Sequence, residues 1–256
     1  MTDMSAERLV SVVVPAYRHA GFILDCLTSI HDQTHRDIEL IVIDDVSPDN
    51  TFDLVRALMA TPFARRFVTA HVLRNDRNLG AHDTINRGIA LSRGQYVAVI
   101  NSDDLYHPDR IAALLAALDD NGSELAFSLV DVLEDPTMTG PLPEAFRLLA
   151  VRQMLALQRD PTTGFALMRA NHAISTGNLL FSRGLYDRVG PFLPLKYCHD
   201  WDFVLQALFY TEPAVVNAPH YLYRLHGSNS FSALGHLAAL ETEVVLRRFF
   251  RRGLAG

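Results

Sequence analysis

Four short, mostly apolar runs recur along the first 100 residues, each followed by polar residues and then by a helical pattern. The runs cover residues 9–14, 38–43, 67–73 and 96–100. Strands that are buried on both faces of a parallel sheet have nearly continuous apolar runs of this kind. Repeated strand–helix alternation therefore predicts a mostly parallel sheet with helices on both faces. We expect Pro15 to end the first strand, because proline cannot donate a ladder hydrogen bond.

The remaining elements follow from periodicity and from turn residues. Asn50 with Asp53 resembles a capping box at the start of a helix that runs to about Met59. The 133–143 segment, rich in Pro, Gly and Thr, is expected to be a surface loop or the border of a second half. Further helices are expected over residues 21–33, 80–91, 144–158, 199–210 and 236–252, and from about 108, with strands over 125–132, 174–181, 214–216 and 221–225.

Size and composition exclude several classes of protein. The chain has 256 residues, of which 49% are apolar, enough for one large α/β domain with or without an appendage. A net charge of −6 gives no reason to expect nucleic-acid binding. No apolar run reaches membrane-spanning length, and two cysteines are too few for a disulfide framework. We therefore expect a cytoplasmic protein.

Two adjacent carboxylates follow the fourth apolar run. Asp103 and Asp104 follow residues 96–100 after two further polar residues, at the carboxyl end of the expected strand, where open α/β sheets bind their ligands. Carboxylate oxygens are the ligands that Mg²⁺ and similar hard cations prefer, commonly together with substrate phosphates. The alternative is that both residues cap the helix that starts near Pro108.

Another acidic group opens the helix expected over residues 199–210. Asp200 follows the proline-broken segment 191–196, and it is a candidate to accept a proton from an attacking hydroxyl. The alternative is that Asp200 only complements the dipole at a helix N-terminus. Spacing leaves both interpretations open.

Six segments carry motifs that occur in the same order in one known family. They are Val-Val-Val-Pro-Ala-Tyr at 12–17, Asp-Asp-Val-Ser at 44–47, Asn-Leu-Gly at 78–80 with Asn86 and Arg93-Gly94, Asn-Ser-Asp-Asp at 101–104, His-Asp-Trp-Asp at 199–202, and Tyr-Arg-Leu-His-Gly-Ser at 223–228. Each motif alone is a weak signal. Together, over residues 11–230, they resemble the inverting family-2 glycosyltransferases of the GT-A fold.

The resemblance implies a GT-A type α/β fold with a Rossmann-like, mostly parallel sheet flanked by helices. It implies one domain over 1–230, with a nucleotide-binding half at about 1–122 and an acceptor-binding half at about 123–230. A helical tail, 231–256, follows. The implied reaction is a metal-dependent inverting transfer from a nucleoside-diphosphate sugar, with a UDP-sugar favoured, to a sugar or a lipid-linked sugar in bacterial-type polysaccharide or glycoconjugate assembly.

Residue roles follow from the motif positions. Asp200 is implied to be the catalytic base, with Mn²⁺ or Mg²⁺ bound by Asp103, Asp104 and His226. Asp45 would accept a hydrogen bond from the nucleotide base, with Asp44 beside it. The nucleotide-sugar side is implied to include Pro15, Ala16, Tyr17, Asp44, Asp45, Asn78, Gly80, Asn86, Ser102 and Asp103, and the acceptor side Gly177, Asn178 and Trp201.

Four positions depart from the family pattern. Asn101 replaces an acidic residue, Val46 a glycine, Arg18 an asparagine and His199 a glutamate. Asn101 is the one feature that favours a non-catalytic sugar-nucleotide-binding domain, which is the alternative from another class. A nucleotidyltransferase is disfavoured because no glycine-rich loop follows the first strand.

The tail has its own alternatives. Four arginines near its end, with Phe249 and Phe250, would suit an anionic membrane surface. A helix packed on the domain, or on a second subunit in a homodimer, is the other interpretation.

Overall fold

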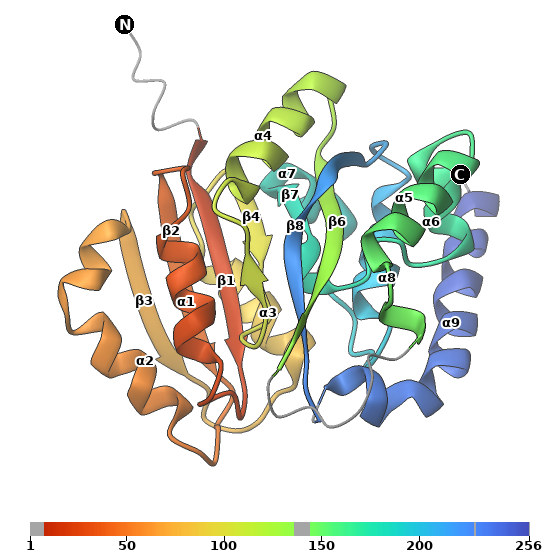
Figure 1. Cartoon of the computed structure of the whole chain (residues 1–256). Helices are drawn as coiled ribbons and strands as arrows, with labels where there is room; N and C mark the ends of the chain where they lie inside the picture. The colour runs from red at the N-terminus through yellow and green to blue at the C-terminus, as the bar shows by residue number, and fades with distance from the viewer. Residues whose placement is uncertain (1–7, 136–143, 228, 256) are drawn as a thin grey trace, which may run out of the picture.

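One eight-stranded mixed sheet organises the part of the chain that the computed structural model describes, residues 8–135, 144–227 and 229–255 (Figure 1). The strand order is β3-β2-β1-β4-β7-β6-β8-β5. The strands β1 to β4 are parallel, β7 is antiparallel to both of its neighbours, and β5 is antiparallel to β8. They span Val10–Ala16 (β1), Ile38–Asp44 (β2), Thr69–Arg74 (β3), Tyr96–Val99 (β4), Leu105–Tyr106 (β5), Leu125–Glu134 (β6), Leu180–Ser182 (β7) and Ala214–Leu225 (β8).

Helices cover both faces of this sheet, which confirms the expected fold class. Short 3₁₀ turns occur at Pro62–Arg66, Glu144–Phe146 and Thr176–Asn178. The α-helices are Ile23–His31 (α1), Thr51–Met59 (α2), Ala81–Leu91 (α3), Arg110–Asn121 (α4), Leu149–Arg159 (α5), Thr163–Arg169 (α6), Arg183–Val189 (α7), His199–Ala207 (α8) and Ser230–Ala255 (α9). None of these described helices combines the length and the apolar character that crossing a membrane requires.

The alternation of side chains along β1 divides the core into two layers. Val10, Val12 and Val14 pack with α1, α2 and α4 on one face, whereas Val13 packs with α3, α7 and α8 on the other. All four valines have no exposed surface. Successive side chains of a strand point to opposite faces, so a strand buried on both sides is mostly apolar.

Several expected boundaries are wrong, each for a local reason. Pro15 does not end β1: it pairs with Ile43, and its missing N–H falls on the side of β4, whose pairing with β1 ends at Val13. Asn50 makes no capping hydrogen bond; Asp49 instead accepts from Thr51 at the start of α2.

In the second half, the boundaries differ in the same way. A 3₁₀ turn at Thr176–Asn178 limits the strand expected over 174–181 to Leu180–Ser182. The two strands expected at 214–216 and 221–225 are one strand, β8, with shifts of register against β6. Of the segment expected to be a loop, residues 136–143 lie outside the described part of the chain.

The parallel pairing brings the carboxyl ends of three strands to one edge of the sheet. Ala16 at the end of β1 pairs with Asp44 at the end of β2, and Val13 pairs with Val99 at the end of β4. The acidic motifs at 44–45 and 101–104 therefore emerge at the same edge, on either side of the end of β1. This edge is where the candidate site lies.

Candidate active site

Asp45 ties the loop after β3 to the end of β2. Its Oδ1 accepts hydrogen bonds from the Asn75 side chain (2.7 Å) and from the Leu79 N–H (2.8 Å), and its Oδ2 accepts from the Gly80 N–H (2.8 Å). Asn78 donates to the Asp45 carbonyl. Both oxygens of the Asp45 carboxylate are thus engaged within the protein, and the residue is 4% exposed.

Asp44 differs from Asp45 in having a carboxylate oxygen without a partner. Its Oδ2 accepts from the Ser47 N–H (3.0 Å) and lies 3.1 Å from Nε of Arg74. Its Oδ1 is buried and makes no hydrogen bond within the described residues. Buried polar atoms are normally satisfied, so an unsatisfied one points to a missing ligand or water.

Asp104 connects the turn after β4 to strand β8 through hydrogen bonds. Its Oδ1 accepts from the Arg224 N–H (2.8 Å), and its Oδ2 accepts from the Tyr221 hydroxyl (2.5 Å) and from the Asn101 amide (3.1 Å). Burial, followed by the neighbouring charge of Asp103, raises the pKa of Asp104 well above its ordinary value. These contacts give Asn101 a physical role, since an amide can donate to Asp104 where the family's carboxylate would repel it.

The helix-capping interpretation of the acidic pair is excluded. α4 begins at Arg110 after Asp109, which makes no side-chain capping bond. The Asp104 oxygens instead reach across to β8.

Asp103 meets His226 at the centre of the site. Nε2 of His226 lies 3.0 Å from Oδ2 of Asp103. Burial would raise the pKa of Asp103, but the hydrogen bond from His226 and the charges of His19 and His226 hold the pKa below its usual value. Asp103 is 9% exposed and His226 is 5% exposed, so the pair lies in a largely desolvated place.

Arg224 braces this pair from the end of β8. Its Nε donates to the Asp103 carbonyl (2.9 Å), and its Nη2 lies 3.0 Å from Asp25 on α1. The guanidinium also sits over the Phe22 ring, 5.2 Å from its centroid. The Tyr-Arg-x-His motif therefore works partly by fixing the turn after β4.

His19 is the residue that the sequence analysis missed. Its Nε2 lies 3.7 Å from Oδ2 of Asp103, and one donor atom from each of His19, Asp103 and His226 lies within 4.8 Å of the others. In the part of the chain that the structure describes, this is the one cluster of three such groups with metal-ligand spacing. Asp104, predicted as a ligand, is not in it. The missed signal is a histidine four residues after Pro15, just beyond the end of the first strand.

Asp200 lies in the first turn of α8 and is 6% exposed. Its Oδ2 accepts from the Asn171 amide (3.0 Å) and its Oδ1 from the Trp201 N–H (2.8 Å). Burial raises the pKa of Asp200, and the charge of His199 and the Asn171 hydrogen bond oppose this shift in part. A raised carboxyl pKa suits a general base, while the first-turn position also suits dipole complementation.

A short polar chain connects the two carboxylate groups. Asn101 donates to Ser175 (2.9 Å), and the next residue, Thr176, contacts Nε2 of His199 (2.8 Å), which precedes Asp200. Tyr223 lies near both carboxylate groups. Burial raises the pKa of Tyr223, and so do the nearby charges, which come from Asp104, Asp103, Tyr197 and Asp200. The structure thus brings the 101–104 and 199–200 motifs to one region.

The residues predicted on the acceptor side have internal contacts. Asn178 has no exposed surface, and its amide bonds with Ser128 and with the Ala173 carbonyl. Trp201 donates to the Leu167 carbonyl (2.8 Å). Gly177 leaves room for Tyr221, whose hydroxyl would lie 1.9 Å from an added Cβ. All three residues therefore pack or form hydrogen bonds within the protein, and their contact with an acceptor stays a prediction.

Two of the residues predicted on the nucleotide side have contacts within the protein, and a third is exposed. Asn86 is occupied, because it bonds with both backbone groups of Phe192 and with the Tyr186 hydroxyl. Ser102 contacts Nδ1 of His19 (2.7 Å). Tyr17, directly after β1, is 42% exposed.

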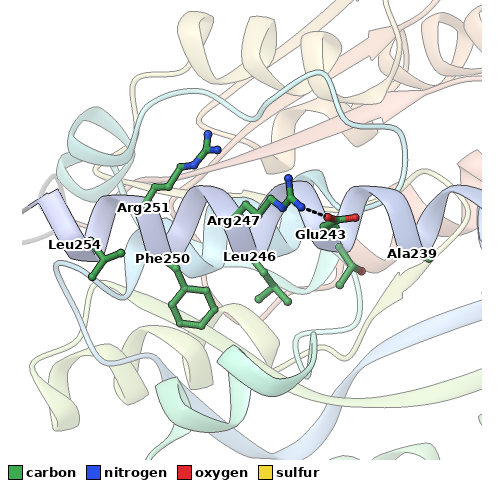
Figure 2. Close-up of a pocket in the computed structure, with 8 residues that line it drawn as sticks. Ala239, Glu243, Leu246, Arg247, Phe250, Arg251 and Leu254 are labelled. Carbon is green, nitrogen blue, oxygen red and sulfur yellow. Dashed lines mark ion pairs between the residues drawn. The ribbon is translucent and has the colours of Figure 1, made fainter.

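The C-terminal helix α9 packs on the domain. Val245 and Phe249 are buried against Trp201 and Leu205 of α8. Arg248 pairs with Asp202, so not every terminal arginine is free for a membrane. The exposed side is a shallow groove along one helix face, with Phe250 57% and Leu254 89% exposed (Figure 2). The predicted membrane contact and homodimer stay untested.

The fold and the site together define a glycosyltransferase of the GT-A fold, as comparison with known proteins shows. Residues 11–190 match the model of glycosyl transferase family 2, and the chain belongs to that family. This confirms the resemblance drawn from the six motifs.

The relatives act in polysaccharide and glycoconjugate biosynthesis. The PGL/p-HBAD biosynthesis glycosyltransferase of Mycobacterium bovis is 27% identical over 235 residues, which cover 90% of this chain and 80% of that protein. The succinoglycan biosynthesis protein ExoO of Rhizobium meliloti is 35% identical over 124 residues, which cover 48% of this chain and 34% of that protein.

Solved structures show the same fold. TarS 1–349 of S. aureus, in complex with UDP-GlcNAc, has a TM-score of 0.67 at 18% identity, and the match covers 88% of this chain and 61% of that one. The mannosyltransferase PcManGT from Pyrobaculum calidifontis, in complex with GDP-Man and Mn²⁺, has a TM-score of 0.64 at 19% identity, with 90% and 61% covered. The chain thus spans about three-fifths of these neighbours.

Proposed function

We propose that this glycosyltransferase moves a sugar from a nucleoside-diphosphate sugar to an acceptor hydroxyl in a single displacement with inversion, and that it depends on a divalent cation. One observation carries the proposal: Asp103 and His226 converge at the carboxyl edge of the sheet, and hydrogen bonds between Asn101 and Ser175 and between Thr176 and His199 connect the turn that holds Asp103 with the helix start that holds the buried Asp200. A metal-binding group beside a candidate base is what such a displacement requires.

The donor set fits a divalent cation. It combines the Asp103 carboxylate with the His226 imidazole, and it lies at the sheet edge where the diphosphate of a bound nucleotide would be expected. A cation bound there would act as a Lewis acid and stabilise the charge that the departing diphosphate gains. The solved neighbours with UDP-GlcNAc, and with GDP-Man and Mn²⁺, support a nucleotide-sugar donor and a metal of this kind.

The nucleotide base is assigned to Asp44 in preference to Asp45. Both Asp45 oxygens already accept from the loop at 75–80, whereas Oδ1 of Asp44 has no partner within the described residues. An N–H of uracil or guanine would satisfy that oxygen. The ring of Tyr17 is exposed at the end of the neighbouring strand and would pack beside the base.

Asp200 takes the proton in this proposal. The acceptor oxygen forms a bond to the anomeric carbon, the bond from that carbon to the diphosphate oxygen breaks, and the hydroxyl proton passes to the Asp200 carboxylate. The Asn171 amide and the Trp201 N–H hold that carboxylate in place. Asn101 gives no reason to prefer a non-catalytic domain, because its amide has partners in Asp104 and Ser175.

The test begins with the donor. A thermal-shift panel of UDP-, GDP-, dTDP- and ADP-sugars, with and without Mn²⁺, identifies the nucleotide, because ligands that bind the folded state raise its apparent stability. With that donor, hydrolysis or transfer is measured for the wild type and for Asp200→Asn. We expect Asp200→Asn to bind donor normally and to lose about 10²–10⁴-fold in rate. Unchanged transfer by Asp200→Asn would show that another group accepts the proton.

A further inference from the structure

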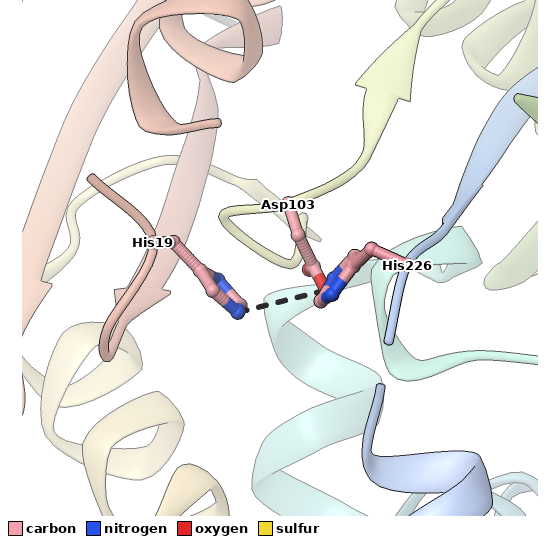
Figure 3. Close-up of side chains that lie close together, drawn as sticks. All are labelled: His19, Asp103 and His226. Carbon is pink, nitrogen blue, oxygen red and sulfur yellow. Dashed lines mark hydrogen bonds and ion pairs between the residues drawn. The ribbon is translucent and has the colours of Figure 1, made fainter. Parts of the chain in front are cut away.

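His19 has a geometry that the proposed function does not use. It lies in the segment between β1 and α1, with its Nε2 3.7 Å from Oδ2 of Asp103. Nε2 of His226 approaches the same oxygen from β8 at 3.0 Å. Figure 3 shows the two imidazoles converging on the Asp103 carboxylate from opposite sides.

The backbone around His19 is held in an unusual conformation. Arg18 has a φ of 59°, in the left-handed region that costs a non-glycine residue about 1–3 kcal/mol. The Arg18 N–H donates to Ser47 (3.0 Å) and the His19 N–H donates to Thr51 (3.0 Å), so the segment after β2 holds this turn. The strained turn directs the His19 side chain toward Asp103.

The His19 ring is also fixed in orientation. Nδ1 contacts the Ser102 hydroxyl at 2.7 Å, which leaves Nε2 as the nitrogen on the Asp103 side. Histidines that bind metals typically use one ring nitrogen for a hydrogen bond that orients the other. Phe22 packs against both imidazoles, with its centroid 5.8 Å from that of His19 and 4.6 Å from that of His226.

The distances suit a shared ion. Metal–nitrogen bonds of about 2.1 Å place two ligands of one ion no more than about 4.2 Å apart. Asp103 already meets this limit with both histidines, and all three donor atoms lie within 4.8 Å of one another. Small side-chain rotations are therefore sufficient to close the set.

We propose that His19, Asp103 and His226 form one metal site, and that its two imidazoles make the protein select a transition metal such as Mn²⁺, Fe²⁺ or Co²⁺ over Mg²⁺. Mg²⁺ takes oxygen ligands, whereas imidazole suits the first-row transition metals, whose affinity rises from Mn²⁺ to Co²⁺. This inference rests on the proposed function for the role of the ion, but the ligand set is tested independently of transfer activity. Asp104 then positions the site by holding β8 to the turn after β4.

The test measures metal binding by the purified full chain without donor. Co²⁺ is followed by its visible absorption, Mn²⁺ by electron paramagnetic resonance, and Mg²⁺ by competition. We expect the wild type to bind Co²⁺ more tightly than Mn²⁺, and Mg²⁺ most weakly. His19→Ala is expected to weaken Co²⁺ at least about 10-fold while changing Mg²⁺ little. His71→Ala removes an exposed histidine of β3 and should leave all three affinities unchanged.

His19→Gln guards against a folding artefact, since it keeps a side chain of similar reach without the imidazole. Both His19 variants are compared with the wild type by circular dichroism and melting in EDTA. Unchanged Co²⁺ affinity in a folded His19 variant, together with loss in Asp103→Ala, would exclude His19 as a ligand and leave the proposed function standing. A wild type that binds Mg²⁺ as tightly as Co²⁺ would overturn the selectivity. Transfer that needs no divalent cation would instead overturn the metal dependence in the proposed function.

Discussion

Nε2 of His226 lies 3.0 Å from Oδ2 of Asp103, although the two residues are 123 positions apart in the chain. Asp103 follows β4 and His226 follows β8, and these strands are not neighbours in the sheet. What joins them is the turn at 101–104, whose Asp104 accepts from the backbone of Arg224. The candidate site therefore depends on contacts between the turn after β4 and the end of β8, which belong to different halves of the sheet.

Val46 carries backbone strain that a glycine would relieve. Its φ is 61°, an outlier for a β-branched residue. We expect Val46→Gly to stabilise the protein by about 1 kcal/mol, because the strain of about 1–3 kcal/mol exceeds the added entropy of the unfolded chain. Urea unfolding measures the change. Val68→Gly, at an exposed site just before β3, is the control and should destabilise by about 0.5–1 kcal/mol. A destabilised Val46→Gly would mean that the side chain's contacts outweigh the strain.

Gly177 is required by the close approach of Tyr221. A Cβ at this position would lie 1.9 Å from the Tyr221 hydroxyl and 3.0 Å from the backbone nitrogen of Asn101. We expect Gly177→Ala to destabilise by about 1–3 kcal/mol and to reduce transfer, since Tyr221 must leave Asp104. Thermal unfolding and initial rates measure both effects. Gly184→Ala on α7, where the nearest atom is 3.9 Å away, should be neutral or stabilising. Equal behaviour of the two variants would refute the steric argument.

The pH dependence of transfer reports on Asp200. A general base must be deprotonated, so the rate falls as the pH drops through the raised pKa of Asp200. The Asn171 hydrogen bond lowers that pKa. We therefore expect Asn171→Ala to move the acid limb of kcat/KM to higher pH. If Asp200 served only the helix dipole, Asn171→Ala would change stability without moving the limb.

Glu39 stabilises the opposite edge of the sheet. Its side chain is fully buried in β2 and accepts from Ser11 (2.5 Å), the Arg93 N–H (2.7 Å) and Arg93 Nε (3.1 Å). Burial alone would raise the pKa of Glu39, but these hydrogen bonds bring it below the usual value. A depressed pKa means stability that is present above the unfolded pKa and lost as pH falls through the folded pKa.

Glu39→Gln is expected to cost about 2 kcal/mol near neutral pH, because hydrogen bonds to a charged group are lost. The difference from the wild type should shrink as pH falls through the depressed pKa of Glu39. Urea unfolding at pH 7, 5 and 3 measures it. Glu243→Gln, which breaks an exposed pair with Arg247 on α9, should cost less than about 0.5 kcal/mol. A cost independent of pH would mean that the charge of Glu39 contributes nothing.

The order of the elements and the family could be predicted from sequence, because both depend on local signals. Unbroken apolar runs such as 96–100 predict strands buried on both faces, and six motifs in order predict the family. Asp103 and Asp104 were candidates because they follow such a run, and Asp200 was a candidate because it opens a helix after the proline-broken segment 191–196. The departures at Arg18 and Val46 were also visible, but their positive φ angles were not.

The tertiary structure decided what each polar group does. Sequence spacing could not separate Asp44 from Asp45, or Asp103 from Asp104, because the difference lies in which partners come from the loop at 75–80 and from β8. It also could not find His19, whose significance depends on a strained turn and on an oxygen 84 residues away in the chain. Hydrophobic periodicity is a local property, whereas hydrogen bonding and metal coordination depend on distances of a few ångströms between segments that only the folded sheet brings together.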